Sequence, residues 1–241
     1  MNVAILLAAG NGTRINSKTP KQFIKVLDKP VLSYTIENFN NCDEIDAICL
    51  VIQNQWRAYT KTLLNKCASN KVRWILEGGE DFNGSVLNAI NGLKNELKDN
   101  DIAVISFGVS PLTTHESIKD SIQKAKLYGN GIASDDMRLS LCIKADEQKS
   151  KAYINRENIK AFSNPWSFKF GPLLQNYNLA QKTNLLNKIE PRTTSLYLAL
   201  GQKIYFSKSS VFNLKITYEE DLDIFEGLLL LKQKRQKNAK L

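Results

Sequence analysis

The stretch LLAAGNGTRINSKTPKQF, residues 6–23, does most to decide the fold. The apolar run Asn2–Ala8 has the pattern of a buried β-strand and leads directly into a loop of small residues, 8–12. Small residues let the backbone approach a ligand closely, and successive N–H groups can form an anion nest. Arg14 and Lys21 add positive charge beside this loop. The segment therefore predicts a site for a nucleoside triphosphate, whose charge the two cations would offset as pyrophosphate leaves.

The loop is not one of the commonest phosphate loops. It matches neither the Walker-type P-loop nor the GxGxxG dinucleotide pattern, so neither of those functions is supported. A glycine turn after a strand is also a frequent structural feature. Taken alone, the loop leaves a purely structural role open.

Short apolar runs alternate with helical stretches beyond the loop. Further strands are expected at 47–53, 71–76 and 102–106, and helices at 30–40, 55–68, 84–97 and 114–127. The helix at 84–97 is expected to begin at Ser85. Single helices between strands are typical of βαβ units, so the pattern predicts an α/β fold with a mostly parallel sheet. Ligands would then bind beyond the carboxyl ends of the strands.

Residues 138–160 interrupt this alternation. Two short β-rich runs flank a polar turn, which predicts a hairpin that protrudes from the sheet as an arm for a partner subunit. After Phe168 we expect a helix, then a strand at 203–206 and a long helix from about Tyr218.

The composition is that of a soluble globular protein. The chain has 241 residues and a mass of 27.2 kDa, of which 43% are apolar and 24% charged, so one domain spanning 1–241 is expected. No apolar run approaches the roughly 20 residues that a membrane helix needs. The start, MNVAILLAAGNG, lacks a basic leader and is expected to be the first strand, not a signal peptide.

Cysteine and histidine usage argues against several chemistries. Cys42, Cys49, Cys67 and Cys142 form no CxxC pair, and His115 has no cysteine neighbour in the sequence. A zinc site and a Ser-His-Asp or Cys-His nucleophile are therefore not expected, and reduced thiols are the default.

The net charge of +9 raises the question of nucleic-acid binding. The last ten residues, 232–241, carry five positive charges and no negative one, which leaves +4 for the rest of the chain. This basic C-terminal tail is predicted to be a solvated, frayed helix end. Nucleic-acid binding is not favoured, because basic and aromatic residues are not interleaved as in RNA-binding motifs.

The whole phosphate segment resembles the AAGxGxR and PKQ signature of nucleotidyltransferases with a three-layer, Rossmann-like fold. Its PKQF ending is similar to that of cytidylyltransferases acting on alditol phosphates, which include the 2-C-methyl-D-erythritol 4-phosphate and ribitol-5-phosphate enzymes. The resemblance extends through five further segments: KPVLSYTIENF (29–39), GGEDFNGSVLNAINGL (78–93), FGVSP (107–111), INRENIKAFSNPWSF (154–168) and NLKITYEEDL (213–222). The GVxP string and the aromatic Phe212 before Asn213 resemble the ribitol-type sequences more closely.

The resemblance implies roles for particular residues. Nucleotide binding would fall to Ala8, Ala9, Gly10, Asn11, Gly12, Thr13, Gly79 and Ser85. Arg14, Lys21 and Lys215 would be the catalytic residues, and Arg156, Lys215 and Thr217 would bind the acceptor phosphate. The resemblance also implies Mg²⁺ as cofactor, CTP and an alditol phosphate as substrates, a homodimer formed through the arm, and a cytoplasmic location. Surface polysaccharide synthesis would be the setting of a ribitol enzyme, and isoprenoid synthesis that of the erythritol enzyme.

Several positions depart from the family pattern, and they cluster where the chemistry is expected. The family's residues are replaced by Ser106-Phe107, Ser110, Phe82, Ser163-Asn164-Pro165-Trp166, Pro191-Arg192 and Phe212. Phe107 stands where the family has the aspartate that helps to hold Mg²⁺, so the metal ligand is unknown, with Glu80, Asp81, Asp135 and Asp136 as candidates. Three hypotheses follow: a cytidylyltransferase with a rearranged metal site, one with an altered acceptor, or a catalytically impaired homologue that binds nucleotide or serves as a partner subunit.

Overall fold

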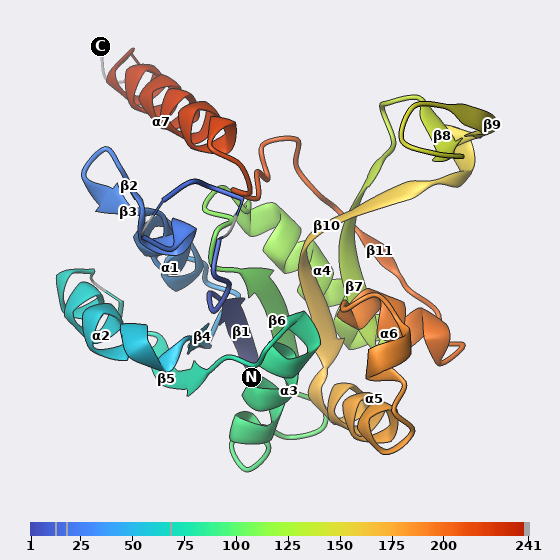
Figure 1. Cartoon of the computed structure of the whole chain (residues 1–241). Coiled ribbons are helices and arrows are strands. Elements are labelled where there is room, and N and C mark those ends of the chain that lie inside the picture. The colour runs from blue at the N-terminus through green and yellow to red at the C-terminus, as the bar shows by residue number, and fades with distance from the viewer. Residues whose placement is uncertain (13, 18, 68, 239–241) are drawn as a thin grey trace.

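The computed structural model describes residues 1–12, 14–17, 19–67 and 69–238. A seven-stranded sheet with the strand order β11-β7-β10-β6-β1-β4-β5 forms its centre (Figure 1). Its strands are β1 (Asn2–Leu7), β4 (Ala47–Ile52), β5 (Val72–Glu77), β6 (Ile102–Phe107), β7 (Asn130–Asp136), β10 (Lys160–Lys169) and β11 (Phe206–Ser207). All adjacent pairs are parallel except those of β10, which is antiparallel to β6 and β7, so the predicted mostly parallel sheet is confirmed.

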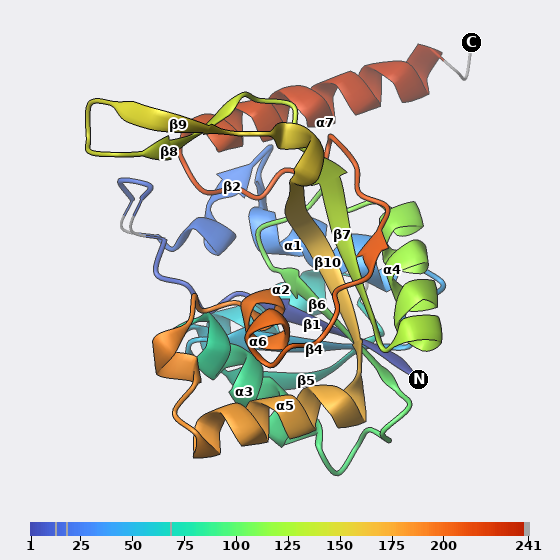
Figure 2. The same cartoon turned by 90° about the vertical axis from the view of Figure 1, so that its right-hand side faces the viewer.

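Helices cover both faces of the sheet and make the predicted three layers (Figures 1 and 2). One face carries α1 (Val31–Asn40), α2 (Arg57–Lys66) and α4 (His115–Tyr128). The other face carries α3 (Phe82–Leu93), α5 (Phe170–Lys182) and α6 (Thr193–Ala199). Parallel sheets covered on both faces are built from strands with continuous apolar runs, as β1 has from Val3 to Leu7.

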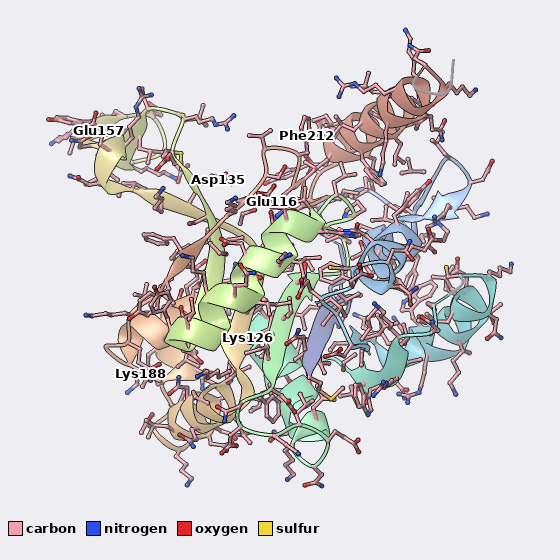
Figure 3. All side chains as sticks on the ribbon, turned by 180° about the vertical axis from the view of Figure 1, so that it is seen from behind. Glu116, Lys126, Asp135, Glu157, Lys188 and Phe212 are labelled. Carbon is pink, nitrogen blue, oxygen red and sulfur yellow. The ribbon has the colours of Figure 1, made fainter. Side chains whose placement is uncertain are left out.

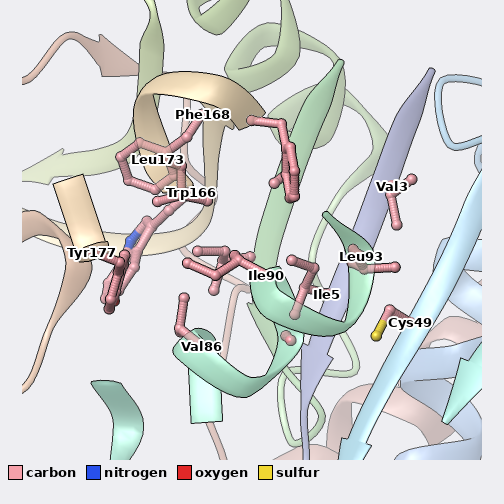
Figure 4. Close-up of a cluster of buried hydrophobic side chains, with 14 of the residues drawn as sticks. Val3, Ile5, Cys49, Val86, Ile90, Leu93, Trp166, Phe168, Leu173 and Tyr177 are labelled. Carbon is pink, nitrogen blue, oxygen red and sulfur yellow. The ribbon is translucent and has the colours of Figure 1, made fainter. Parts of the chain in front are cut away.

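The core is divided between these two faces because successive side chains of a strand point to opposite sides. Ile5 of β1 packs with Val86 and Ile90 of α3 in one cluster, which Figure 4 shows in close-up. Its neighbours on the strand, Ala4 and Leu6, pack toward α1 and α4.

The topology places a crevice at the carboxyl ends of β1 and β6. After β1 the chain builds β4 and β5 on one side and then returns to build β6 on the other. Leu7 and Phe107, the last residues of β1 and β6, pair with each other, and the Gly108 N–H donates to the Leu7 carbonyl at 2.8 Å. Such a reversal of strand order is where α/β sheets bind their ligands.

The predicted protruding hairpin is confirmed. The strands β8 (Leu141–Lys144) and β9 (Ser150–Ile154) form a two-stranded antiparallel hairpin that stands away from the sheet (Figure 2). A 3₁₀ turn at Arg156–Asn158 then leads into β10. Most of the hairpin's side chains are exposed, including Tyr153 at 83%.

Three predicted boundaries need correction. α3 begins at Phe82 and not at Ser85, because the Asp81 carboxylate accepts a hydrogen bond from the Gly84 N–H at 2.7 Å and caps the helix. The strand expected at 203–206 is limited to Phe206–Ser207. The long C-terminal helix α7 begins at Glu220 and not at Tyr218, and it runs to Asn238, so it includes the described part of the basic tail.

Three buried elements escaped prediction. Two of them are β7, whose sequence NGIASDD combines glycine with two aspartates, and α6, a short helix of seven residues. The third is β10, whose Pro165 argues against a central strand. The register of β10 against β7 shifts between Phe162 and Trp166, so the proline lies at an irregularity that needs no ladder hydrogen bond from it.

Candidate active site

A cavity of about 250 Å³ lies at the carboxyl ends of β1, β5 and β6. Eight of the residues predicted for the site line it: Ala8, Ala9, Gly10, Arg14, Lys21, Gly79, Ser85 and Lys215. Gln22, Phe82, Phe107 and Arg192, to which the sequence assigned no role, line it as well. The fold thus brings together segments that are more than 200 residues apart in the sequence.

Gln22 holds the shape of the predicted phosphate loop, which is the loop of small residues 8–12. Its buried amide donates to the carbonyl of Ala8 at 2.7 Å and to that of Gly10 at 3.1 Å. With these carbonyls occupied, N–H groups of the loop remain for a ligand, which is the polarity that an anion nest requires. The available sequence signal was the amide that directly follows Lys21 in PKQF.

The backbone at Gly12 has a conformation that favours glycine. Its φ of +69° lies in the left-handed region, and a Cβ there would approach the Lys21 nitrogen to 3.1 Å. Gly12 therefore lets the chain turn back toward Lys21, although it does not itself line the cavity.

The opposite wall of the cavity is the start of α3. Ser85 Oγ accepts a hydrogen bond from the Gly79 N–H at 3.1 Å, which fastens the Gly78-Gly79 turn to the first turn of the helix. A Cβ at Gly79 would lie 2.4 Å from the Gly84 carbonyl carbon, so no larger residue fits there. The Gly78-Gly79 turn is therefore packed closely against the first turn of α3.

Four cationic side chains converge on the cavity: Arg14, Lys21, Arg192 and Lys215. The Lys21 ammonium donates to the carbonyl of Ile216 at 2.8 Å, which joins the phosphate loop to the segment that carries Lys215. The Arg14 guanidinium carbon lies 5.6 Å from the ring centre of Tyr218.

Burial and neighbouring positive charges lower the pKa of two of these side chains, Lys215 and Lys21. Burial, together with the charges of Arg192, Lys21 and Arg14, lowers the pKa of Lys215 to about 8. Burial and Arg14 also lower the pKa of Lys21 from its ordinary value. A bound anion would raise both pKa values again. The lowered values therefore indicate that the cavity is suited to bind a polyanion.

Three aromatic rings form the boundary between this cavity and the next. The ring centres of Phe82, Phe107 and Trp166 lie 5.6 to 5.9 Å apart. Two of the rings each contact a cation. The Lys215 ammonium lies 3.9 Å from the centre of the Phe107 ring, and the Arg192 guanidinium carbon lies 5.4 Å from the centre of the Phe82 ring. These cation–π contacts hold both positive groups at the boundary.

The second cavity, of about 440 Å³, shares Phe107, Arg192 and Lys215 with the first. Its remaining lining is mostly polar or aromatic: Asp135, Ala161, Phe162, Ser163, Asn164, Trp166 and Asn213. Two anionic groups, one in each cavity, could therefore meet at Arg192 and Lys215.

Buried Asn164 is the centre of a hydrogen-bond network beneath the second cavity. Its Oδ1 accepts from Ser106 Oγ at 2.7 Å and from Thr113 Oγ1 at 3.2 Å. Its Nδ2 donates to Ser110 Oγ at 3.2 Å. Asn213 joins the network by donating through Nδ2 to Ser163 Oγ at 2.9 Å and to the Asn164 carbonyl. Ser106, Ser110 and Asn164 are among the departures from the family pattern, and here they satisfy one another's polar groups.

A family model described as IspD, 2-C-methyl-D-erythritol 4-phosphate cytidylyltransferase, matches residues 2–230 of the chain. The chain belongs to this cytidylyltransferase family. The ribitol-5-phosphate cytidylyltransferase of Lacticaseibacillus paracasei is 31% identical over 233 residues, which cover 97% of this chain and all of that protein. The 2-C-methyl-D-erythritol 4-phosphate cytidylyltransferase of Clostridium novyi is 33% identical over 229 residues, or 95% and 96% of the two chains.

Solved structures show the same fold. The crystal structure of 4-diphosphocytidyl-2C-methyl-D-erythritol synthase from Anaerococcus prevotii aligns with a TM-score of 0.77 at 21% identity, covering 95% of this chain and 98% of that one. The cytidylyltransferase-family fold predicted from the sequence is thereby confirmed. In the part of the chain that the structure describes, no helix is both long and apolar enough to cross a membrane.

Some predicted site residues of this cytidylyltransferase-family enzyme lie outside both cavities. Asn11 is exposed and accepts a hydrogen bond from Gln53 Nε2. Thr217 donates through Oγ1 to the Lys215 carbonyl at 3.1 Å, and its N–H donates to Asp221. Arg156 is exposed at the base of the arm and donates to the Arg138 carbonyl at 3.0 Å. Thr13 lies outside the described residues.

At the end of β6 the residues present do not fit the Mg²⁺ site that the cytidylyltransferase family implies, because Phe107 offers no oxygen ligand there. Magnesium takes oxygen ligands in near-octahedral geometry, usually one or two carboxylates together with substrate phosphates and water. Over the described ranges, no group of three or more His, Cys, Asp or Glu side chains is placed to hold a metal ion. Of the four candidates, Asp81 caps α3, Asp136 pairs with Lys160 at 2.5 Å, Asp135 lies at the second cavity, and Glu80 is the remaining carboxylate of the first.

The lowered pKa of Lys215 predicts a pH-dependent affinity for phosphate anions. The ammonium is lost as the pH rises through about 8, so we expect the Kd for CTP to rise about tenfold between roughly pH 7 and pH 9. Lys215→Arg keeps its charge over this range and should remove most of the change. Titration calorimetry in matched buffers measures both, and a wild-type affinity independent of pH would contradict the assignment.

The lowered pKa of Lys215 also affects the free energy of unfolding, which is expected to rise over the pH range in which the affinity for CTP falls. Because the folded pKa is below the ordinary value of 10.5, the unfolded chain holds more protons at Lys215 between about pH 8 and 10.5. The free energy of unfolding is therefore expected to increase as the pH rises through this window, because the cost of burying the Lys215 charge is lost.

Proposed function

We propose that the protein transfers the cytidylyl group of CTP to an alditol phosphate and releases pyrophosphate. The observation that carries this proposal is the pair of adjoining cavities that share Arg192 and Lys215. The first cavity, with the phosphate loop and the start of α3, would hold CTP. The second, with the polar floor around Asn164, would hold the polyol chain of the acceptor. CTP is a cytoplasmic nucleotide, so we propose that the reaction takes place in the cytoplasm.

The proposed reaction needs no covalent enzyme intermediate. An oxygen of the acceptor phosphate would attack the α-phosphorus of CTP in line, and the bond to the β-phosphate would break to release pyrophosphate. Lys215 and Arg192, at the boundary, would orient the attacking phosphate, while Lys21 and Arg14 would offset the charge on the leaving group. Catalysis would then rest on positioning and on fixed positive charge.

We propose a ribitol 5-phosphate-like acceptor first and 2-C-methyl-D-erythritol 4-phosphate next. The polar lining of the second cavity, which includes the hydroxyl of Ser163 and the carboxylate of Asp135, suits an acceptor with several hydroxyl groups. The GVxP string at 108–111 and Phe212 support the ribitol side. Phe212 is exposed on the segment that leads to α7 and does not line the second cavity (Figure 3).

A pyrophosphate-release assay tests the proposal. CTP is offered with ribitol 5-phosphate or with 2-C-methyl-D-erythritol 4-phosphate, in buffers that contain either Mg²⁺ or EDTA. Release that requires CTP and is faster with ribitol 5-phosphate supports the proposed function. CTP binding without pyrophosphate release in the presence of either acceptor would instead support the catalytically impaired homologue.

We also propose a homodimer formed through the arm, 138–160. An isolated two-stranded hairpin is only marginally stable in water, yet this one exposes Leu139, Ile143 and Tyr153. Arg156 reaches neither cavity of its own chain, so in this proposal it would serve the acceptor site of the partner. In Figure 3, Asp135 lies between the body of the molecule and the arm that carries Glu157.

The dimer gives a direct prediction. Light scattering at micromolar concentration is expected to report twice the 27.2 kDa chain mass for the wild type. Tyr153→Glu, which places charge on the exposed hairpin, is expected to shift the protein to monomer. Tyr59→Glu is the matched control, because Tyr59 is exposed on α2, away from the arm. A monomeric wild type would contradict the proposed dimer.

A further inference from the structure

We infer that the first cavity binds CTP as the metal-free polyanion, with Arg192 supplying positive charge that a divalent cation would otherwise supply. This inference rests on the proposed function, since it concerns the form in which that function's donor nucleotide is bound.

The first argument is the chemistry at the end of β6. Phe107 lies next to the phosphate loop, because β6 pairs with β1 in register up to Leu7. A side chain with no oxygen ligand therefore occupies the strand end that faces the expected triphosphate. The Lys215 ammonium lies 3.9 Å from the centre of this ring and would repel a divalent cation placed there.

The second argument is the balance of charge around the cavity. Four cationic side chains line it, and its two carboxylates, Glu80 and Asp81, are both exposed. Asp81 already accepts a backbone hydrogen bond as the cap of α3. An uncomplexed triphosphate carries more negative charge than its Mg²⁺ complex and so matches this surplus better. The lowered pKa values of Lys21 and Lys215 agree with a surplus of positive charge.

The third argument is the position of Arg192. Its side chain lines both cavities and is two-thirds buried, with its guanidinium held against the Phe82 ring. Glu190, its ion-pair partner, is 4.0 Å from Nε, at the limit of a salt bridge. A guanidinium is permanently charged and can bind two phosphate oxygens at once. It can therefore bridge donor and acceptor phosphates where they meet, without a metal ion.

Titration calorimetry with the full-length protein and CTP, in EDTA and in MgCl₂, tests the inference. We expect CTP to bind in EDTA at least as tightly as in MgCl₂. Arg192→Gln should weaken binding in EDTA about tenfold or more. Arg73→Gln is the matched control, because Arg73 is exposed on β5 and lines neither cavity. Phe107→Asp adds an oxygen ligand and should make the affinity greater in MgCl₂ than in EDTA.

The outcomes separate this inference from the proposed function. Wild-type binding that is lost in EDTA and restored by MgCl₂ would overturn the inference alone and leave the cytidylyltransferase proposal standing. Absence of CTP binding in both solutions would overturn the proposed function and the inference with it. The wild-type comparison decides the question even if a variant proves unstable.

Discussion

Replacing Lys21 with alanine is expected to lower kcat/KM for CTP-dependent pyrophosphate release by about 100- to 1,000-fold. Two losses combine in this variant. The first is a half-buried cation that would offset charge on the departing pyrophosphate. The second is the hydrogen bond of 2.8 Å from the ammonium to the Ile216 carbonyl, which ties the phosphate loop to the segment bearing Lys215.

The Lys21→Ala experiment has a matched control in the same segment. Lys25 is exposed on the short strand β2 (Lys25–Val26) and lines neither cavity, so Lys25→Ala should keep wild-type kinetics. Lys21→Arg keeps the charge but changes its geometry, and an intermediate activity is expected. If Lys21→Ala were as active as the wild type, the loop would have a structural role only.

Replacing Gly79 with alanine is expected to remove CTP binding and to destabilise the fold by about 1–3 kcal/mol. The new Cβ would lie 2.4 Å from the Gly84 carbonyl carbon and 2.8 Å from the Ser85 nitrogen. Both are backbone atoms at the start of α3, so the turn and the helix must separate. That separation breaks the Gly79–Ser85 hydrogen bond and opens the wall against which the base is expected to lie.

Urea unfolding and CTP-induced thermal shifts measure the two effects of Gly79→Ala. Gly227→Ala in α7 is the control, because a Cβ at this position would meet no atom within 4 Å apart from its chain neighbours and the backbone of its own helix. That variant should keep the wild-type CTP shift and gain up to about 1 kcal/mol of stability from the better helix propensity of alanine. A Gly79→Ala protein with a normal CTP shift would show that the start of α3 is not part of the nucleotide site.

Features that depend on neighbouring residues were predictable from the sequence. The apolar run of β1 followed by small residues predicted the phosphate loop, because strand burial and close backbone approach are set by residue types within a few positions. The alternation of strands and helices predicted the layered fold for the same reason. The arm was recognisable because its two β-rich runs flank a polar turn.

The strands that depend on distant neighbours were not predictable. β10 is a central strand despite Pro165, because β6 and β7 pair with it on both sides and its irregularity accommodates the proline. β7 holds its place between β10 and β11 in spite of a weak local pattern. In these elements tertiary pairing overrides local propensity.

The residues of the candidate site also fall into a group that the sequence predicts and a group that only the tertiary structure brings together. By itself the sequence determined the phosphate loop with Arg14 and Lys21, since these residues lie within one short segment. Only the tertiary structure placed Arg192 and Lys215 on the rings of Phe82 and Phe107, which come from four separate segments of the chain. The physical reason is that a cation–π contact or a shared cavity wall depends on how sheet and helices pack, and residue spacing along the chain does not contain that distance.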